Sequence, residues 1–165
     1  MPDTRWIFDA VSIGNFFLSG GEELLLRRYS RRMVISWQVY DELTAGAIRF
    51  PALRKIQALV THKRLPVVTL TSGEHAEYSH WIRRLGKGES ACLAVAHARS
   101  WTVVTDDKAA RQECASAGIA VTGTIGILVA ACRDRQVRVE EADALLCGMI
   151  EAGFYSPVAS ISKIL

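Results

Sequence analysis

The segment from Leu85 to Gly123 constrains the fold more than any other part of the chain. It reads LGKGESACLAVAHARSWTVVTDDKAARQECASAGIAVTG. After a glycine-containing loop, Glu89 to Arg99 predicts a packed helix. Trp101 to Thr105 then predicts a short strand, because β-branched and aromatic residues fill it. Two acids and a second helical segment follow. Since this strand is apolar throughout, we expect helices to cover both of its faces, as in a parallel sheet.

The rest of the chain repeats this alternation of strands and helices. Four other segments predict strands, and they are 5–10, 33–36, 66–70 and 119–121. Such an order predicts an α/β fold in which a central, mostly parallel sheet of about five strands lies between two layers of helices. The 165 residues suit one domain over residues 1–165.

The carboxyl-terminal part predicts two further helices. Val139 to Phe154 is amphipathic. Ser156 and Pro157 are typical of a helix start, and they predict a final helix over 158–165. We expect the helices of about 139–165 to pack as an extension of the sheet domain.

Two acidic residues come at the ends of predicted strands. Asp9 closes the strand segment in RWIFDA, and Asp106 follows WTVVT. In open α/β sheets, ligands bind at the edge formed by the carboxyl ends of the strands. Each acid alone is also typical of a helix N-cap, so a site at this edge is predicted only together with further acids.

Glu89 is the third candidate. It lies in the first turn of its predicted helix, where free backbone N–H groups favour an anion. At helical spacing it shares a face with Cys92, Leu93 and Ala96, so it points along the packed side of the helix. Taken alone, it is equally typical of an acid at a helix start.

Glu42 is the fourth candidate. Trp37 to Ala47 predicts a helix in which Glu42 lies on the same side as Val39 and Leu43. Asp41 points nearly opposite, because each residue advances a helix by about 100°. A carboxylate on a packed face is costly without a partner. This favours Glu42 over Asp41 as a site residue, with an ion pair to an arginine as the alternative.

Four carboxylates at one edge of a sheet require a cation, because their charges repel one another. Oxygen ligands of this kind select Mg²⁺ or Mn²⁺. A divalent ion lowers the pKa of bound water and neutralises a phosphate in the transition state. The acids therefore predict phosphodiester hydrolysis with one or two ions.

The basic residues give weaker guidance. The net charge of 20 − 17 = +3 permits a nucleic-acid partner without requiring one. Arg83, Arg84 and Lys87 precede Glu89 and are the basic residues best placed for an anionic substrate, with a solvated helix end as the alternative. Another cluster, in RRYSRR from Arg27 to Arg32, is either a solvated face or a phosphate-binding surface.

Composition also indicates the compartment. The four cysteines show no C-x-x-C spacing and lie mostly in apolar helical patterns, which predicts reduced thiols and a cytoplasmic protein. No two histidines have the spacing of a helical zinc site. The sequence shows no signal peptide and no apolar run long enough to span a bilayer, so we expect no association with a membrane.

Four motifs together resemble the PIN-domain family, in particular the PIN-like proteins found beside small antitoxin genes. They are WIFDA with Asp9, VISWQVYDEL with Glu42, LGKGES with Glu89, and VVTDDKAAR with Asp106. The pattern LGxGE followed by a DD pair is the most specific part. VTGTIGIL and the closing segment from GFYS to the final IL extend the resemblance over nearly the whole chain.

The resemblance implies a Mg²⁺- or Mn²⁺-dependent endoribonuclease that hydrolyses phosphodiester bonds of single-stranded or structured RNA. Such proteins are often the toxin of a toxin–antitoxin pair, commonly homodimers silenced by a small antitoxin protein. The implied catalytic residues are Asp9, Glu42, Glu89 and Asp106, and the implied metal ligands are Asp9, Glu89, Asp106 and Asp107. Asp107 is either a ligand or a helix cap.

Three residues are expected to contact the substrate phosphate, namely Arg83, Lys87 and Arg111. Arg111 matches the arginine of the family motif and either contacts phosphate or pairs with an acid.

Two other functions are to be weighed. The first is a catalytically weak or inactive PIN-like module that binds RNA or a protein partner. The family usually has Ser or Thr one or two residues after the first acid, whereas this chain has Ala10, Val11 and then Ser12, which slightly favours that alternative. The second is a phosphatase with Asp9 as nucleophile, but such sites generally have a second Asp where this chain has Val11. Nucleotide cofactors are not expected, because no G-x-G-x-x-G or Walker loop is present.

Overall fold

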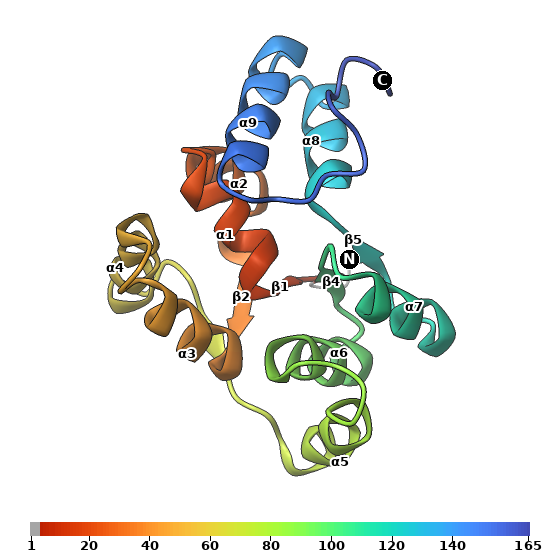
Figure 1. Cartoon of the computed structure of the whole chain (residues 1–165). Helices are drawn as coiled ribbons and strands as arrows, with labels where there is room; N and C mark the ends of the chain where they lie inside the picture. The colour runs from red at the N-terminus through yellow and green to blue at the C-terminus, as the bar shows by residue number, and fades with distance from the viewer. Residues whose placement is uncertain (1–3) are drawn as a thin grey trace.

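The structure of the protein is a computed structural model that describes residues 4–165. Five short strands form one sheet (Figure 1). They are β1 (Trp6–Phe8), β2 (Met33–Ser36), β3 (Val67–Val68), β4 (Thr102–Val104) and β5 (Val121–Thr122). Their order across the sheet is β3-β2-β1-β4-β5, and every neighbouring pair is parallel. The predicted parallel sheet of about five strands is confirmed.

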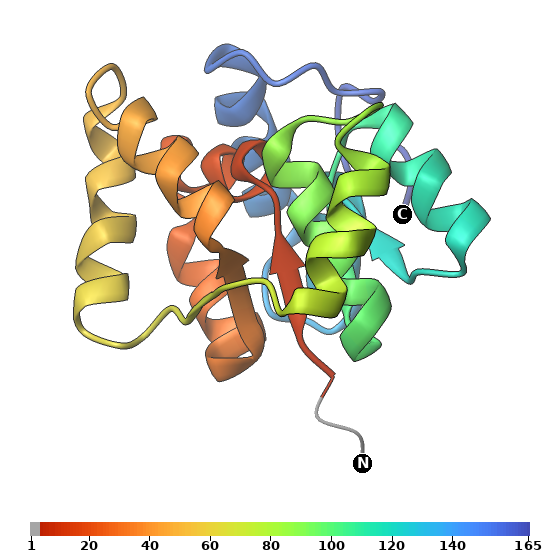
Figure 2. The ribbon, with the colours of Figure 1, turned by 90° about the horizontal axis from the view of Figure 1, so that it is seen from below.

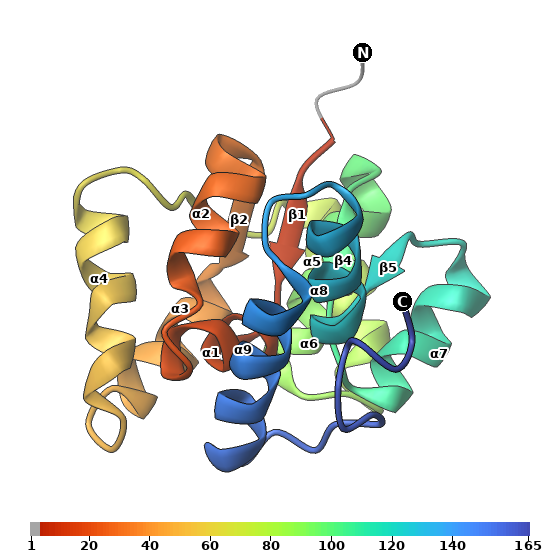
Figure 3. The same cartoon turned by 90° about the horizontal axis from the view of Figure 1, so that it is seen from above.

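Helices cover both faces of the sheet, as predicted for a three-layer α/β fold. On one side lie α1 (Ala10–Leu18), α2 (Glu22–Tyr29), α8 (Thr124–Arg133) and α9 (Val139–Glu151) (Figures 1 and 3). On the other side lie α5 (Ser72–Trp81) and α6 (Lys87–Arg99). The ends of the sheet are flanked by α3 (Trp37–Gly46) and α4 (Arg54–Thr61) beside β3, and by α7 (Lys108–Ala117) beside β5. Single 3₁₀ turns precede β2 (Ser30–Arg32) and α4 (Pro51–Leu53).

The strands are aligned so that their carboxyl ends reach one edge. Trp6 is paired with Met33 of β2 and with Thr102 of β4. The backbone N–H of Asp9, just after β1, donates to the carbonyl of Val104 at 3.0 Å. Because the strands are so short, the residues that follow β1 and β4 emerge side by side.

The core is built on both faces of the sheet. Ile7, Val34 and Val103 are fully buried, as predicted for apolar strands in a parallel sheet. In α6, every residue from Ser90 to Ala96 is buried, which is typical of a helix inside a domain. This central position of α6 brings its first turn, with Glu89, to the carboxyl edge of the sheet.

The sequence also offers Ser72 as a cap for α5, and this prediction is wrong. Ser72 is the first helical residue, and Thr71 is the N-cap. The hydroxyl of Thr71 accepts from the N–H of Glu74 at 3.2 Å, and the carboxylate of Glu74 accepts from the N–H of Thr71 at 2.9 Å. This reciprocal capping box satisfies two backbone donors that a cap at Ser72 would leave open.

The helix predicted over 158–165 is also wrong, because these residues form bends and turns. Asp143 of α9 accepts hydrogen bonds from the N–H groups of Ile161 and Ser162 at 2.5 and 3.1 Å. Ile161 is fully buried. An eight-residue helix is marginal by itself, and here a carboxylate and an apolar anchor organise the segment instead. The predicted carboxyl-terminal extension therefore consists of α9 and an irregular tail.

None of the helices described within residues 4–165 is long and apolar enough to cross a membrane.

Candidate active site

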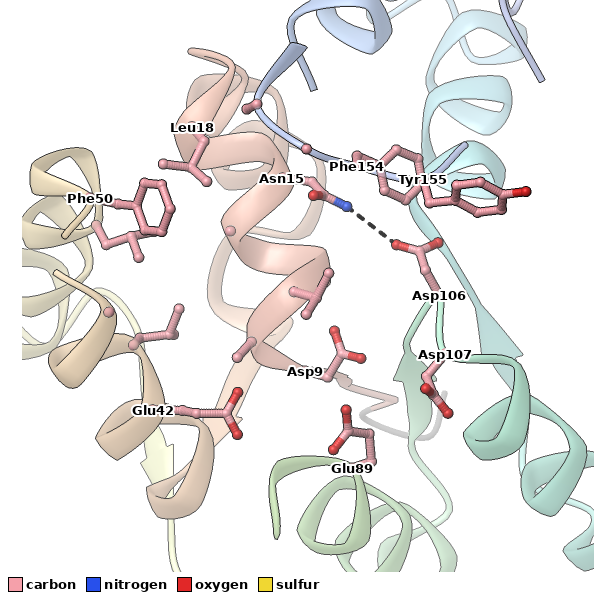
Figure 4. A pocket seen from close by; sticks show the side chains of 18 of the residues that line it. Asp9, Asn15, Leu18, Glu42, Phe50, Glu89, Asp106, Asp107, Phe154 and Tyr155 are labelled. Atoms are coloured by element: carbon pink, nitrogen blue, oxygen red, sulfur yellow. Dashed lines mark hydrogen bonds between the residues drawn. The ribbon is translucent and has the colours of Figure 1, made fainter. Parts of the chain in front are cut away.

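The carboxyl edge of the sheet opens into a cavity of about 740 Å³. Five carboxylates line it, and they belong to Asp9, Glu42, Glu89, Asp106 and Asp107. They come from four separate parts of the chain: the end of β1, the helices α3 and α6, and the segment between β4 and α7. Figure 4 shows Asp9, Glu42 and Glu89 pointing toward one another, with Asp106 and Asp107 beside them. The structure thus brings together acids that are far apart in the sequence.

Asp9 is both a helix cap and part of the cavity wall. Its Oδ1 accepts from the N–H of Ser12 at 2.8 Å, and its Oδ2 accepts from the hydroxyl of Thr105 at 2.5 Å. Only 2% of Asp9 is exposed. Burial raises the pKa of its carboxyl from 3.8 to about 6, against the opposing hydrogen bonds from Thr105 and Ser12, and the charge of Asp106 adds to the rise.

Asp106 is held by a second group of polar side chains. Thr124 donates to it twice, from its backbone N–H at 2.8 Å and from its hydroxyl at 2.5 Å. The hydroxyl of Ser12 donates at 3.2 Å, and the amide of Asn15 lies at 3.5 Å (Figure 4). Ser12 thereby connects the two strand-end acids, through its N–H to Asp9 and through its hydroxyl to Asp106.

The glycines of the LGKGE motif provide space for two glutamates. A Cβ atom on Gly86 would lie 2.6 Å from Oε2 of Glu89, and one on Gly88 would lie 3.3 Å from Oε1 of Glu42. Burial raises the pKa of the Glu42 carboxyl, and the charges of Glu89 and Asp41 raise it further. Glu42 lines the cavity and Asp41 does not, as the helical geometry predicted. The packed position predicted for Glu42 is wrong, because its side chain is exposed to solvent and only Val39 and Leu43 of α3 are buried.

Asp107 forms the N-cap of α7. Its Oδ1 accepts from the N–H of Ala110 at 2.8 Å, and the side chain also lines the cavity. The sequence left the choice between cap and metal ligand open. The cap uses one of the two carboxylate oxygens, so it does not prevent the other from binding a cation.

The basic residues of the site differ from those that the sequence favoured. Lys108 lines the acidic cavity, and with Arg111 it also lines a second cavity of about 730 Å³ that shares Asp106 with the first. Arg111 donates to the carbonyl of Thr105 at 3.0 Å. Arg83 and Lys87 are exposed and line neither of these two cavities.

Arg84, which was considered with them, forms an ion pair with Glu113 at 2.9 Å.

Apolar and aromatic side chains form the rest of the wall. Phe50 and Leu18 lie on one side of the acidic cavity, and Phe154 and Tyr155 lie above Asp106 (Figure 4). Phe154 and Tyr155 line both cavities. Tyr155 is 94% exposed, so its ring is available to a ligand. Sequence analysis did not assign these residues a role.

Four polar residues were not predicted as partners of the acids, although Ser12 was noted as the first hydroxyl after Asp9. They are Ser12, Asn15, Thr105 and Thr124, all of them buried. Thr105 directly precedes the DD pair, and Thr124 begins α8. Their hydroxyls at a strand end and a helix start, beside predicted site acids, are the signal from which they could have been found.

The donor set fits a divalent cation in its chemistry. Within residues 4–165, none of the five carboxylates forms an ion pair with Lys, Arg or His. A carboxylate has about four acceptor positions, and Asp9 uses two of them. The acids as placed do not form a ready-made metal-binding group of three, because no such group of His, Cys, Asp or Glu occurs among the described residues. Small side-chain movements would have to complete a coordination shell.

Comparison with known proteins gives a family and a structural neighbour. A family model described as "DUF3368: PIN domain" matches residues 5–165. Among solved structures, VapBC-1 from nontypeable Haemophilus influenzae is similar with a TM-score of 0.56 and 15% sequence identity, covering 73% of this chain and 98% of that chain. At this identity the similarity shows a shared fold. A search of curated proteins finds no match.

Proposed function

Because the chain belongs to the PIN-domain family, we propose that it is a divalent-metal-dependent endoribonuclease. PIN domains are generally metal-dependent nucleases. The observation that carries the proposal for this chain is the convergence of five carboxylates in one cavity, none of them in an ion pair with a residue of the described range 4–165. Such an accumulation of negative charge is unfavourable unless a cation binds.

We propose Asp9, Glu89, Asp106 and Asp107 as the residues that hold Mg²⁺ or Mn²⁺, with Glu42 as the fourth acid of the catalytic group. Hard oxygen donors of this kind suit both ions. When bound, the ion would activate water and offset charge on the phosphate. The buried hydroxyls of Ser12, Thr105 and Thr124 keep the strand-end carboxylates in fixed orientations, as neighbouring hydrogen bonds do for metal ligands generally.

The walls of the cavity support RNA as the substrate. Lys108 lines both cavities and Arg111 lines the second one, which shares Asp106 with the first, so the two cations would bind a phosphate next to the one that is cut. The exposed ring of Tyr155, close to Asp106, suits a base that is not paired, since unpaired bases stack on aromatic side chains. We therefore favour single-stranded RNA, or the unpaired loops of structured RNA.

The biological setting belongs to the same proposal. The resemblance to PIN-like proteins found beside antitoxin genes supports the toxin of a toxin–antitoxin pair, a homodimer in the cytoplasm that a small antitoxin protein silences. The four cysteines are free thiols, in keeping with a reducing compartment.

A second candidate function follows from one observation. The oxygens of Asp106 already accept hydrogen bonds from Ser12, Asn15 and Thr124, and the acids form no metal-binding group as placed. This favours a PIN-like module with weak or no catalysis that binds RNA or a protein partner. Such a module could bind RNA without any affinity for Mn²⁺.

The deciding experiment measures cleavage of a labelled single-stranded RNA with added Mn²⁺ or Mg²⁺. We expect cleavage that EDTA abolishes, and that Asp9→Asn or Asp106→Asn also abolishes. Asp41→Asn is the matched control, because Asp41 is on the same helix as Glu42 but outside the cavity. Cleavage that persists in both variants would rule out the assignment, and calorimetry with Mn²⁺ would show whether the parent protein binds the ion.

A further inference from the structure

A row of cations lies at the edge of the sheet opposite to the acids. Each member precedes a strand: Arg5 precedes β1, Arg31 and Arg32 precede β2, and Lys63 and Arg64 precede β3. We call these five residues the basic edge. In Figure 2 the amino-terminal segment and the α4–β3 connection lie together on the side from which β1 and β2 start. The two edges of one sheet thus carry opposite charge.

The basic edge lines a cavity of its own. Its volume is about 610 Å³, and four of the five residues line it together with His62. None of the described residues that line it is Asp or Glu. The neighbouring cavity shares His62 and Arg64 with it and has two acids, Glu22, which is paired with Lys55, and Glu23.

The structure separates this group from the rest of the arginine cluster in RRYSRR. Arg27 donates to the carbonyl of Gln136, and Arg28 forms an ion pair with Asp134 at 2.8 Å. Those two arginines therefore connect α2 with the loop that precedes α9. Arg31 lines the basic cavity, so it is available for another role.

The dipoles of neighbouring helices offset only part of the positive charge of the basic edge. The carboxyl ends of α2 and α4 lie beside the basic edge, and each carries about half a negative charge. Two such ends offset about one of the three full charges of Arg31, Lys63 and Arg64. A surplus of about two charges remains for a ligand.

Aromatic rings hold parts of this edge in place. The guanidinium of Arg32 lies 5.0 Å from the ring centre of Trp6, and that of Arg5 lies 5.6 Å from the ring of Trp101. Cation–π contacts of this kind restrict the side chains before a ligand arrives. From β3 to β1 the basic edge spans two strand spacings, about 10 Å, which is roughly three nucleotides of a stacked strand.

We propose that the basic edge binds the phosphate backbone of a nucleic-acid strand, as a second contact surface remote from the acidic cavity. The proposal rests on the proposed function for the identity of the ligand as RNA. Its physical reason is that the acidic cavity repels phosphate until a cation binds, so affinity has to come from another surface. Arginine and lysine contacts to phosphate supply affinity without sequence preference.

The test is fluorescence anisotropy of a labelled single-stranded RNA with the whole chain in EDTA, where cleavage does not interfere. We expect the double variant K63E/R64E to bind about tenfold or more weakly at ~0.1 M salt, and the slope of log affinity against log salt to fall by about 1.4 for two lost contacts. The control R133E/K163E changes the net charge equally but lies outside the basic cavity, and it should bind within a few-fold of the parent. Equal losses in both variants, or no loss in the first, would overturn the proposal.

Two competition experiments identify the class of ligand. Inorganic phosphate at the same phosphate concentration should not displace the RNA, and displacement would show a site for small anions instead of a strand. Polyglutamate should compete poorly, and equal competition would show a site for an acidic protein segment. If K63E/R64E fails to fold, as judged by circular dichroism, the neutral pair R31Q/R64Q decides, because it leaves the strained backbone at Lys63 (φ 57°) unchanged.

The outcomes for the two proposals are separable. If the parent protein does not cleave RNA but K63E/R64E binds RNA more weakly than the parent, the basic edge is supported and the nuclease is ruled out. If the parent protein cleaves RNA and K63E/R64E binds RNA as tightly as the parent does, the nuclease is supported and the basic edge is ruled out.

Discussion

A Cβ atom on Gly123 would lie 2.5 Å from Oδ1 of Asp106. Gly123 has an extended backbone (φ −140°), so its role is to leave space and not to allow an unusual conformation. The same added atom would lie 3.1 Å from the carbonyl oxygen of Thr105. Asp106 can therefore occupy its position only because residue 123 has no side chain.

We predict that Gly123→Ala displaces the Asp106 carboxylate and lowers RNA cleavage by about a hundredfold, the usual effect of a misplacement near 1 Å. The crowding should also cost about 1–3 kcal/mol of unfolding free energy. Gly14→Ala is the control, because Gly14 also lines the cavity but an added Cβ there meets nothing within 4 Å. Cleavage rates and urea unfolding of both variants check the prediction, and parental activity in Gly123→Ala would contradict it.

Asp9 gives a prediction for stability against pH in the absence of metal. Its pKa is about 6 in the folded protein and 3.8 as the ordinary value, so the native state holds a proton that the unfolded state releases. The stabilisation is complete below about pH 4 and is lost as the pH rises through 6. The loss amounts to about 3 kcal/mol.

Urea unfolding in EDTA at several pH values measures this effect as the difference between the parent and Asp9→Asn. Asparagine does not titrate and can still accept from Ser12, so we expect its unfolding free energy to fall less between pH 4 and pH 7, by about 3 kcal/mol. Parallel curves for the two proteins would show that Asp9 has an ordinary pKa.

Asp107 allows its two roles to be separated. Serine is about as good an N-cap as aspartate, whereas alanine costs about 1 kcal/mol at that position. We expect Asp107→Ser to keep the parental unfolding free energy and Asp107→Ala to lose about 1 kcal/mol. Both variants lack the carboxylate, so both should cleave RNA more slowly to the same extent. Parental cleavage by Asp107→Ser would show that Asp107 is a cap and not a ligand.

Local patterns predicted the parts of the fold that depend on local physics. The strand Met33–Ser36 has the predicted bounds, because an apolar run is a property of the segment itself. The predicted final helix does not form, because the carboxylate of Asp143, which is distant in sequence, accepts a hydrogen bond from the N–H group of Ile161. The sequence of residues 158–165 by itself gives no indication of such a contact.

In the candidate site, too, local patterns predicted some features, whereas contacts between distant residues were not predicted. Strand ends and helical faces were enough to place Asp9, Glu42, Glu89 and Asp106 on one cavity, because parallel strands bring their carboxyl ends to one edge. The contacts that hold these acids, such as Thr124 to Asp106, join residues 18 positions apart across a register that no local pattern specifies. The aromatic wall was missed for the same reason, since Phe50 and Tyr155 meet the acids only after folding.

Tyr155 provides a test of how the substrate is held. Its ring is 94% exposed and lines both cavities that contain Asp106. A large exposed aromatic side chain gains little from the fold, and we propose that Tyr155 stacks on a base of the substrate. Removing one stacked base costs about 1–3 kcal/mol of binding free energy.

We therefore expect Tyr155→Ala to weaken binding of single-stranded RNA by about five- to a hundredfold, and Tyr155→Phe to bind as the parent does, because stacking uses the ring and not the hydroxyl. Ile48→Ala is the control, since Ile48 is 85% exposed but lines neither cavity. Quenching of 2-aminopurine fluorescence in the RNA reports stacking directly. If Tyr155→Ala keeps the quenching and the affinity of the parent, the base lies elsewhere, and the apolar side of the cavity around Phe50 becomes the place to examine.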